Sequence, residues 1–210
     1  MGFDVYYQLF EKRRYASVRR AALAFIERRD PGPLRAELAE ARERLPPDEA
    51  LARLDFGPFL YRKEKLDRLT QRFERTLLRG DSGTDELDGI MREEVIPTLV
   101  ESCVAWRSRV DPSQTMSAGA LPELLSSQSR WLEDKIVMNA FDPEEREELE
   151  FRYGEADVLL SRKVLARLDR ELAAIPRPRD PVARDDLAAF RKLVAAARSR
   201  KELGLLMSLH

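Results

Sequence analysis

Two short Trp-Arg elements carry the side chains in this sequence that are best suited to binding. Trp106, Arg107 and Arg109 form the first element, and Arg130 with Trp131 forms the second. Tryptophan and arginine are enriched at binding hot spots, and a guanidinium stacked on an indole suits anionic or planar ligands. We predict a ligand or partner contact at these residues, which Tyr153 could join. The alternative is that both tryptophans lie in the core while their arginines reach solvent.

Nucleophilic catalysis has few candidate groups in this chain. Cys103 is the only cysteine, and the only histidine is the last residue, His210. A reactive nucleophile usually needs a neighbouring base that is held in place, whereas an unpaired cysteine is most often a small buried hydrophobe. The motifs of phosphate-binding loops, dinucleotide-binding loops, zinc proteases and nucleophile elbows are missing from the sequence. We therefore expect a non-catalytic protein.

Acidic segments are the remaining candidates for a metal site. Residues 81–92 begin like a calcium-binding loop, but Glu86 stands where such a loop needs glycine and Arg92 where it needs a bidentate acid. The acids of residues 144–148 match half of the paired ExxE and ExxD pattern with which helices hold magnesium, and the other half is missing. One histidine and one cysteine do not make a zinc centre. We therefore expect neither a metal nor a cofactor.

The elements that hold these side chains are predicted to be helices over most of the chain. The sequence is rich in Ala, Leu, Glu and Arg, which favour helices, and has 9 Gly in 210 residues. Apolar residues recur at helical intervals over residues 33–45, 58–79, 84–110, 121–140, 142–175 and 182–210. The strongest helix start is Asp142-Pro143-Glu144-Glu145. These patterns predict an all-α fold, a compact bundle of about seven to eight helices forming a single domain over residues 1–210.

Some segments leave this helical prediction open. Residues 3–10 combine helical spacing with the aromatic and β-branched content of a strand, so a short two-stranded element with residues 54–61 is an alternative. Pro97 lies inside one predicted helix, where we expect a kink or a break. Gly154 lies inside another at a cost of roughly 1 kcal/mol relative to Ala, which a long packed helix tolerates, with a conformational break as the alternative. Residues 111–120 form the longest polar stretch of small residues and are predicted to be a loop.

Charge is distributed unevenly along the chain. The net charge is −1 overall, but +5 for residues 1–80, −12 for residues 81–160 and +6 for residues 161–210. Basic terminal helices packed around an acidic centre would neutralise these charges within the fold. Recruitment of a partner of opposite charge is the alternative. The low overall charge disfavours nucleic acid, although a basic cluster in residues 12–20 could contact phosphate.

These observations favour a non-catalytic protein-interaction or regulatory module, such as an adaptor or a toxin-neutralising partner, whose partner is another protein. The alternatives are a small-molecule-binding protein or enzyme that uses Arg, Tyr and carboxylates, and a nucleic-acid-binding regulator. A homo-oligomer is also compatible with the sequence. No apolar run reaches the roughly 20 residues of a membrane span, and residues 11–14 are charged where a signal peptide would be apolar. We therefore expect a cytoplasmic protein without a membrane partner.

Overall fold

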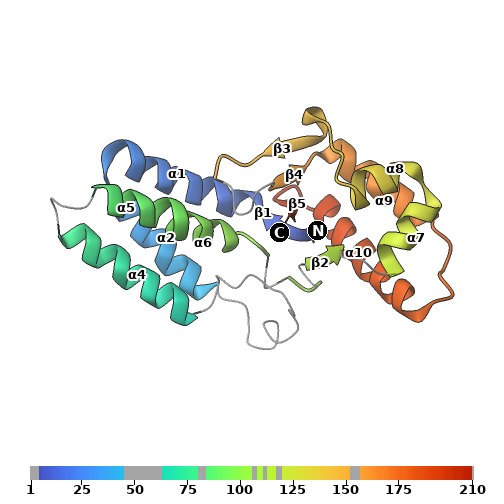
Figure 1. Ribbon diagram of the computed structural model, residues 1–210, viewed down its shortest axis with the longest axis horizontal. Coiled ribbons are helices and arrows are strands. Elements are labelled where there is room, and N and C mark those ends of the chain that lie inside the picture. Colours follow the sequence, from blue (N-terminus) through green and yellow to red (C-terminus); the bar gives the residue numbers. More distant parts are fainter. Residues whose placement is uncertain are drawn as a thin grey trace. The chain divides into compact units, whose positions relative to one another are not determined.

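The chain folds into two compact units, shown as a computed structural model in Figure 1. Unit 1 comprises residues 1–11, 108–149 and 154–210, and unit 2 comprises residues 12–107 and 150–153. The structure describes residues 5–44, 63–79, 84–105, 108–110, 113–116, 120–151 and 157–209. The single domain expected over residues 1–210 stays a prediction.

Unit 2 is a helical bundle (Figure 1). Its elements are α1 (Lys12–Arg28), α2 (Gly32–Glu43), α4 (Lys63–Leu78), α5 (Thr84–Ile90), the π-helical turn η1 (Met91–Val95) and α6 (Ile96–Glu101). Helix α1 packs on α2 and α6, and α4 packs on α2 and α5. The rings of Phe25 and Phe73 lie 5.8 Å apart in the core between α1 and α4. In their described residues, the helices predicted over 33–45 and 58–79 are confirmed as α2 and α4.

Pro97 interrupts the helix predicted over residues 84–110, as expected. Proline has no backbone N–H and its ring collides with the carbonyl four residues earlier, so a regular α-helix cannot continue through it. The chain widens into η1 immediately before the proline, where Ile96 N–H donates to the carbonyl of Met91. The helix resumes as α6 and ends at Glu101, well before residue 110.

Unit 1 contains a five-stranded antiparallel sheet, so the strictly all-α prediction is wrong although the described chain is mostly helical. The strands are β1 (Val5–Glu11), β2 (Ser113–Met116), β3 (Arg146–Glu148), β4 (Val158–Leu160) and β5 (Leu203–Leu209). Their order across the sheet is β2-β1-β5-β4-β3. The longest pairing joins β1 to β5 from Val5↔Leu209 to Glu11↔Leu203. The sheet therefore brings the first and last described segments of the chain side by side.

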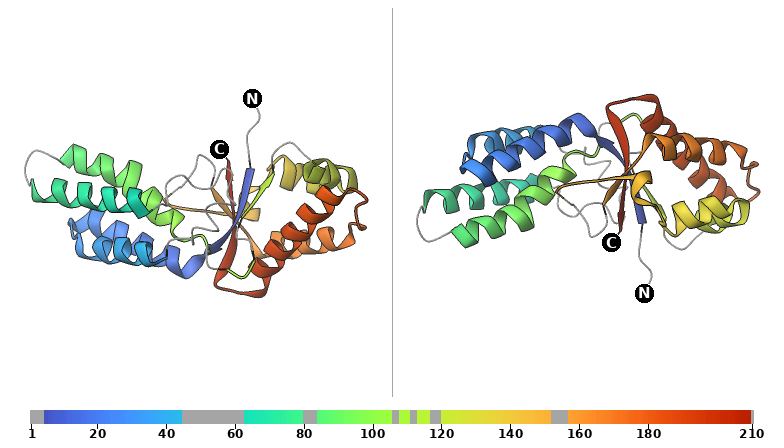
Figure 2. Two further views of the ribbon diagram at one scale, coloured as in Figure 1. Left: turned by 90° about the horizontal axis from the view of Figure 1, so that it is seen from below. Right: turned by 90° about the horizontal axis from the view of Figure 1, so that it is seen from above.

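Helices of unit 1 cover one face of this sheet (Figure 2). They are α7 (Ala120–Gln128), α8 (Arg130–Leu132), the π-helical turn η2 (Glu133–Val137), α9 (Arg162–Ala174) and α10 (Pro181–Ser199). Helix α10 packs on α9, β1 and β5. The ring of Tyr7 lies 5.4 Å from that of Phe190, and its hydroxyl donates to the carbonyl of Ile136 at 2.9 Å and to Asn139 Oδ1 at 3.1 Å. None of the helices in the described segments has the length and apolar character that crossing a bilayer requires.

Two segments predicted to be helical contain strands, and residues 3–10, which the sequence leaves open between helix and strand, form a strand in their described part. Residues 5–11 form β1, and its partners are β2 and β5; the alternative partner, residues 54–61, lies outside the described residues. The start at Asp142 does form a capping box, but it opens one 3-10 turn (Pro143–Glu145) and then β3. The last helix ends at Ser199, and residues 203–209 form β5. In β1 and β5, strand pairing buries the apolar side chains in the core of unit 1. The residues of β3 are charged, and this strand instead extends the sheet by pairing with β4.

Candidate functional site

The residues predicted to bind a ligand or partner are only partly described by the structure. Trp106, Arg107 and Tyr153 lie outside the described residues. Arg109 is exposed in a short irregular stretch of unit 1. Arg130 and Trp131 lie on α8 of the same unit. The predicted contact region therefore stays a prediction, and the structure describes only Arg109 and the second Trp-Arg element, Arg130 and Trp131.

Trp131 stacks with an arginine other than its sequence neighbour. The guanidinium carbon of Arg167, on α9, lies 4.5 Å from the centre of the Trp131 ring. Arg130 points to solvent, with a side chain 91% exposed and an ion pair to Asp134 at 3.7 Å. Consecutive residues on a helix diverge by about 100°, so Trp131 can be half-buried while Arg130 is not. The indole Nε1 is enclosed, and no described residue accepts its hydrogen bond.

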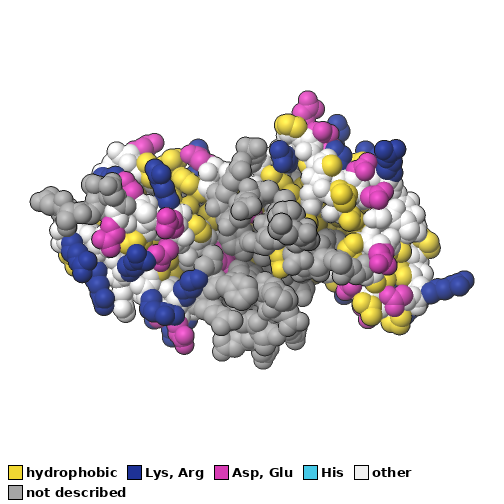
Figure 3. All heavy atoms as spheres, viewed as in Figure 1, with side chains coloured by type: hydrophobic (Ala, Val, Ile, Leu, Met, Phe, Trp, Pro, Cys, Tyr) yellow, Lys and Arg dark blue, Asp and Glu magenta, His cyan; other side chains and the backbone are white. Residues whose placement is uncertain are grey.

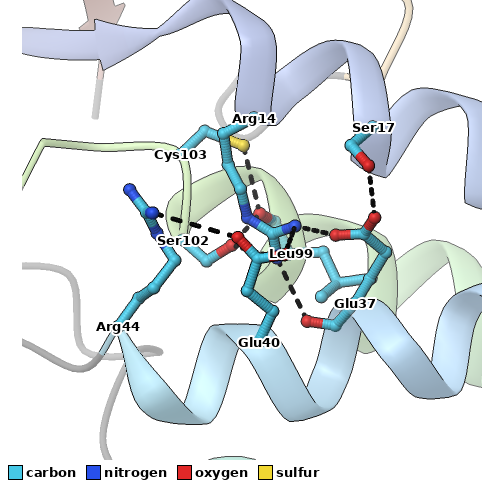
Figure 4. A network of polar contacts seen from close by, with 8 residues as sticks. All are labelled: Arg14, Ser17, Glu37, Glu40, Arg44, Leu99, Ser102 and Cys103. Carbon is cyan, nitrogen blue, oxygen red and sulfur yellow. Dashed lines mark hydrogen bonds and ion pairs between the residues drawn. The ribbon is translucent and has the colours of Figure 1, made fainter.

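Cys103 belongs to a buried polar network in unit 2 (Figure 4). Its thiol is fully buried and lies 3.4 Å from the carbonyl oxygen of Leu99. The centre of the network is an ion pair between Arg14 on α1 and Glu37 on α2, which are 5% and 7% exposed. Arg14 also donates to Ser102 Oγ at 3.4 Å. These contacts join α1, α2 and the end of α6, so the network serves to fix the bundle's packing.

A second face of unit 2 carries charge outward, along α4. Five exposed cations are spaced alternately three and four residues apart: Lys65, Arg68, Arg72, Arg75 and Arg79. This spacing keeps them on one side of a helix. The buried residues of α4 each follow a cation of this set by one position and face the core. They are Leu66, Leu69, Phe73 and Thr76. We name the five cations the α4 stripe, and Figure 3 shows Lys and Arg side chains gathered over this part of the bundle.

The two flanks of α4 differ in how their charges are used. On the flank toward α2, Asp67 pairs with Arg42 at 3.1 Å and Glu74 with Arg35 at 2.6 Å. The Arg35 guanidinium lowers the pKa of the Glu74 carboxyl through this hydrogen-bonded contact. On the stripe's flank, Arg72 pairs with Glu94.

The rest of the α4 stripe is not engaged in ion pairs. Arg68 donates to a backbone oxygen, that of Glu64, at 3.2 Å. Lys65, Arg75 and Arg79 have no ion-pair partner among the described residues. Two acids of α4, Asp67 and Glu74, are therefore paired on the flank toward α2, while most of the stripe has no ion-pair partner among the described residues.

A third feature is a buried polar region on the sheet of unit 1. Paired residues of an antiparallel sheet lie on the same face, and successive residues alternate between faces. Tyr7, on β1, faces α10, so Gln8 lies on the opposite face, and so does Ser208 of β5, which pairs with Tyr6. Gln8 is 3% exposed and Ser208 is fully buried. Burying a polar group without a partner costs about 1–3 kcal/mol, so a buried polar group without a hydrogen bond in this region would lower the stability of unit 1.

No metal centre is found in the described segments, where no group of three or more His, Cys, Asp or Glu side chains could hold an ion. Comparison of the chain with models of known protein families, with curated proteins and with solved structures finds no match. The α4 stripe and the polar sheet face are therefore interpreted from their geometry and chemistry.

Sequence reasoning missed both of these features for different reasons. The spacing of Lys65, Arg68, Arg72, Arg75 and Arg79 is visible in the sequence, and a search for charge at helical intervals would have found it. The polar sheet face had no such signal, because Gln8 and Ser208 are 200 residues apart. The sequence leaves the segment of Gln8 open between helix and strand, and it predicts a helix for the segment of Ser208. Only the pairing of β1 with β5 places them together.

Proposed function

We propose that the chain is a non-catalytic protein-interaction module that binds an acidic surface of another protein through the α4 stripe. The observation that carries this proposal is the set of exposed cations at helical spacing, of which Lys65, Arg75 and Arg79 have no ion-pair partner among the described residues. The fourteen steps from Lys65 to Arg79 span about 21 Å of helix. A partner helix or strand with carboxylates along a similar length would match it.

The energetic role of such a stripe is to select a partner and accelerate its approach. Each exposed ion pair contributes about 0–1 kcal/mol, so the stripe alone does not give tight binding. Complementary potentials do raise association rates and exclude partners of the wrong charge. Leu78 is 83% exposed at the same end of α4 as Arg79, and it offers an apolar contact beside the charges.

Carboxylates near the stripe favour a protein over a nucleic acid as partner. DNA carries a negative charge about every 1.7 Å of its axis, so acids close to the contact surface repel it. Glu64 is exposed at the start of α4, and Glu93 and Glu94 lie on η1, which packs against α4. A protein can place its own charges to avoid these acids, whereas a phosphate backbone cannot. A second copy of the chain is the simplest competing protein partner.

The cellular setting in this proposal is the cytoplasm. Cys103 is the chain's one cysteine, and it is buried with its thiol against Leu99. Small secreted domains usually carry disulfides, so a single buried thiol supports a reducing compartment.

The proposal is tested by reversing charge on the stripe. The variant Lys65→Glu, Arg75→Glu, Arg79→Glu changes exposed side chains only, so we expect it to fold. The matched control is Lys163→Glu, Arg170→Glu, Lys192→Glu, which makes the same charge change at exposed positions of α9 and α10. Each tagged full-length protein is used to capture partners from the native host at low salt, and the bound proteins are quantified. We expect one stoichiometric acidic partner that the control retains and the stripe variant loses by at least about tenfold.

Three results would count against this function. The first is that the wild-type chain captures no stoichiometric protein. The second is a partner that the stripe variant and the control retain equally. The third is retardation of DNA or RNA by the wild-type chain in a low-salt gel shift, abolished by the stripe variant, which would replace the protein partner with nucleic acid. Capture of the chain itself, lost in the stripe variant, would identify a homo-oligomer instead.

A further inference from the structure

The α4 stripe has a regular geometry that bears on the shape of its partner. Its first four cations lie within the α-helix Lys63–Leu78. Arg79 continues the helical pattern, because its N–H donates to the carbonyl of Arg75 at 3.3 Å. At about 1.5 Å per residue, the intervals between neighbouring cations average about 5.3 Å along the helix axis. At about 100° per residue, all of the cations fall within an arc of about 80°, so the stripe is a narrow row of positive charge with a fixed repeat.

A partner helix presents carboxylates at this repeat, whereas an extended segment does not. Acids three and four residues apart along one face of a helix are also spaced by about 5.3 Å on average. Same-face residues of an extended strand are about 6.7 Å apart. The mismatch between a strand and the stripe grows by about 1.4 Å per interval and reaches about 6 Å over its whole length. Exposed ion pairs need about 4 Å or less between the charged atoms, so a strand in register with one end of the stripe is out of register at the other.

The direction of the stripe also fits a helix. Lys65, Arg72 and Arg79 are seven residues apart, and such positions drift around a straight α-helix by about 20° per seven residues. Two helices that cross at about 20°, as in left-handed pairs, follow this drift along their contact. A partner helix can therefore stay on the stripe for its whole length of about 21 Å.

The backbone of α4 gives an extended partner no hydrogen bonds. Extended peptides gain affinity by adding a strand to an exposed sheet edge, where main-chain N–H and C=O groups pair. In the interior of a helix these groups are already bonded to one another. A partner helix needs no such bonds, because its own backbone groups are paired internally. Side chains alone therefore make the contact, which favours a helix over a strand.

We propose that the acidic partner of the proposed function, on which this inference rests, docks on the α4 stripe as an α-helix. Its carboxylates lie three and four residues apart along one face, over about 21 Å. Arg72, in the middle of the stripe, is already paired with Glu94. The partner's carboxylates therefore act mainly on the two cations at each end of the stripe.

Three synthetic peptides test the helical partner on the full-length chain. Each has roughly 21 residues, long enough for an isolated helix to form in part, and carries five glutamates in an alanine-rich background with blocked ends. In the first peptide the glutamates are alternately three and four residues apart, on one face. In the second they are five residues apart, which spreads them around the helix. The third has the glutamates of the first and two central prolines that prevent the helix.

The readout is the NMR signals of the α4 backbone amides while each peptide is added at low salt. We expect the same-face peptide to shift these signals saturably, and the spread and proline peptides to bind at least about fivefold more weakly. The charge-reversed stripe variant should lose binding of the same-face peptide. The matched control variant of α9 and α10 should keep it.

Different results would overturn the helical partner and the proposed function. If all three peptides bind the wild type equally well and the stripe variant binds none of them, the stripe recruits acidic segments without selecting a helix, and only the helical partner is wrong. If the same-face peptide shifts no α4 signal of the wild type, or binds the stripe variant equally well, the helical partner and the proposed function both fail.

Discussion

Arg162 and Arg191 each cap the C-terminal end of the other's helix. Arg162 begins α9 and donates to the carbonyls of Ala197 and Arg198, at 2.8 and 3.1 Å, and of Arg200 at 2.6 Å, where α10 ends. Arg191 lies on α10 and donates to the carbonyl of Leu172 at 2.5 Å and of Ile175 at 2.7 Å, where α9 ends. The last carbonyls of a helix lack intrahelical partners and attract cations. The α9–α10 hairpin is therefore fastened at both of its ends.

Removal of either capping arginine is expected to destabilise unit 1. Arg162→Ala and Arg191→Ala should each lower the free energy of unfolding by about 2 kcal/mol, because each leaves several carbonyls without a charged donor. The two caps lie at opposite ends of the hairpin, so their effects should add to within about 0.5 kcal/mol in the double variant. Hydrogen exchange of α9 and α10 amides measures the loss. Arg170→Ala, at an exposed position of α9, is the control, and an equal effect there would refute the capping role.

Tyr7 provides a prediction about hydrogen bonding in the core of unit 1. Tyr7→Phe keeps the ring against Phe190 but leaves Ile136 O and Asn139 Oδ1 without their donor. We expect the free energy of unfolding to fall by about 1–2 kcal/mol, measured by urea titration. An unchanged unfolding midpoint would show that these acceptors find another donor.

The same tyrosine also predicts a dependence of stability on alkaline pH. Complete burial raises the pKa of the Tyr7 hydroxyl well above its ordinary value of 10.0. Above pH 10 the unfolded chain loses this proton while the folded chain keeps it, so stability is intact below that pH and falls above it. The slope from one such group is about 1.4 kcal/mol per pH unit. Tyr7→Phe should reduce the alkaline loss of stability by about this amount, and parallel pH profiles for both proteins would contradict the assignment.

Removing one partner of the buried Arg14–Glu37 ion pair is expected to lower the free energy of unfolding far more than replacing both partners with apolar residues. Arg14→Met leaves the Glu37 carboxylate buried beside Ser17, whose hydroxyl donates to it at 2.6 Å. We expect a loss of about 3–5 kcal/mol from this variant, and a much smaller loss when Glu37→Leu is added, because the pair's desolvation is then removed on both sides. A double-mutant cycle with thermal unfolding measures the coupling. Additive losses from the two single variants would mean that the pair contributes no specific interaction.

Arg167 and Arg130 are expected to differ in their effect on Trp131, because only Arg167 stacks on its ring. Arg167→Ala removes the guanidinium that stacks on the indole and should cost about 0.5–1 kcal/mol. It should also make Trp131 more accessible to a fluorescence quencher. Arg130→Ala changes a side chain directed to solvent and should alter neither quantity. Substituting Phe for Trp106 in all of these proteins leaves Trp131 as the only emitting tryptophan, and equal quenching in both variants would contradict the stacking geometry.

The helices of unit 2 could be predicted from the sequence, whereas among the strands of unit 1 only β1 was indicated, as the alternative for residues 3–10. The intervals of Leu66, Leu69 and Phe73 place them on one face of any helix, so α4 follows from local pattern alone. The apolar residues of β5 fit a helix and a strand equally well, because a short apolar run does not define its own period. The N-cap predicted at Asp142 forms, as part of a capping box, but the chain then enters β3 and not the predicted long helix.

What the sequence determined by itself is the mostly helical content, the position of the Pro97 interruption and the uneven charge along the chain. These properties follow from local sterics, backbone hydrogen bonding and residue type, which neighbours in the sequence control. The tertiary structure decided that β1 pairs with β5, that Arg167 rather than Arg130 stacks on Trp131, and that Gln8 and Ser208 share a buried face. Each of these depends on contact between distant segments, whose free energy comes from burying shared surface and cannot be read from either segment alone.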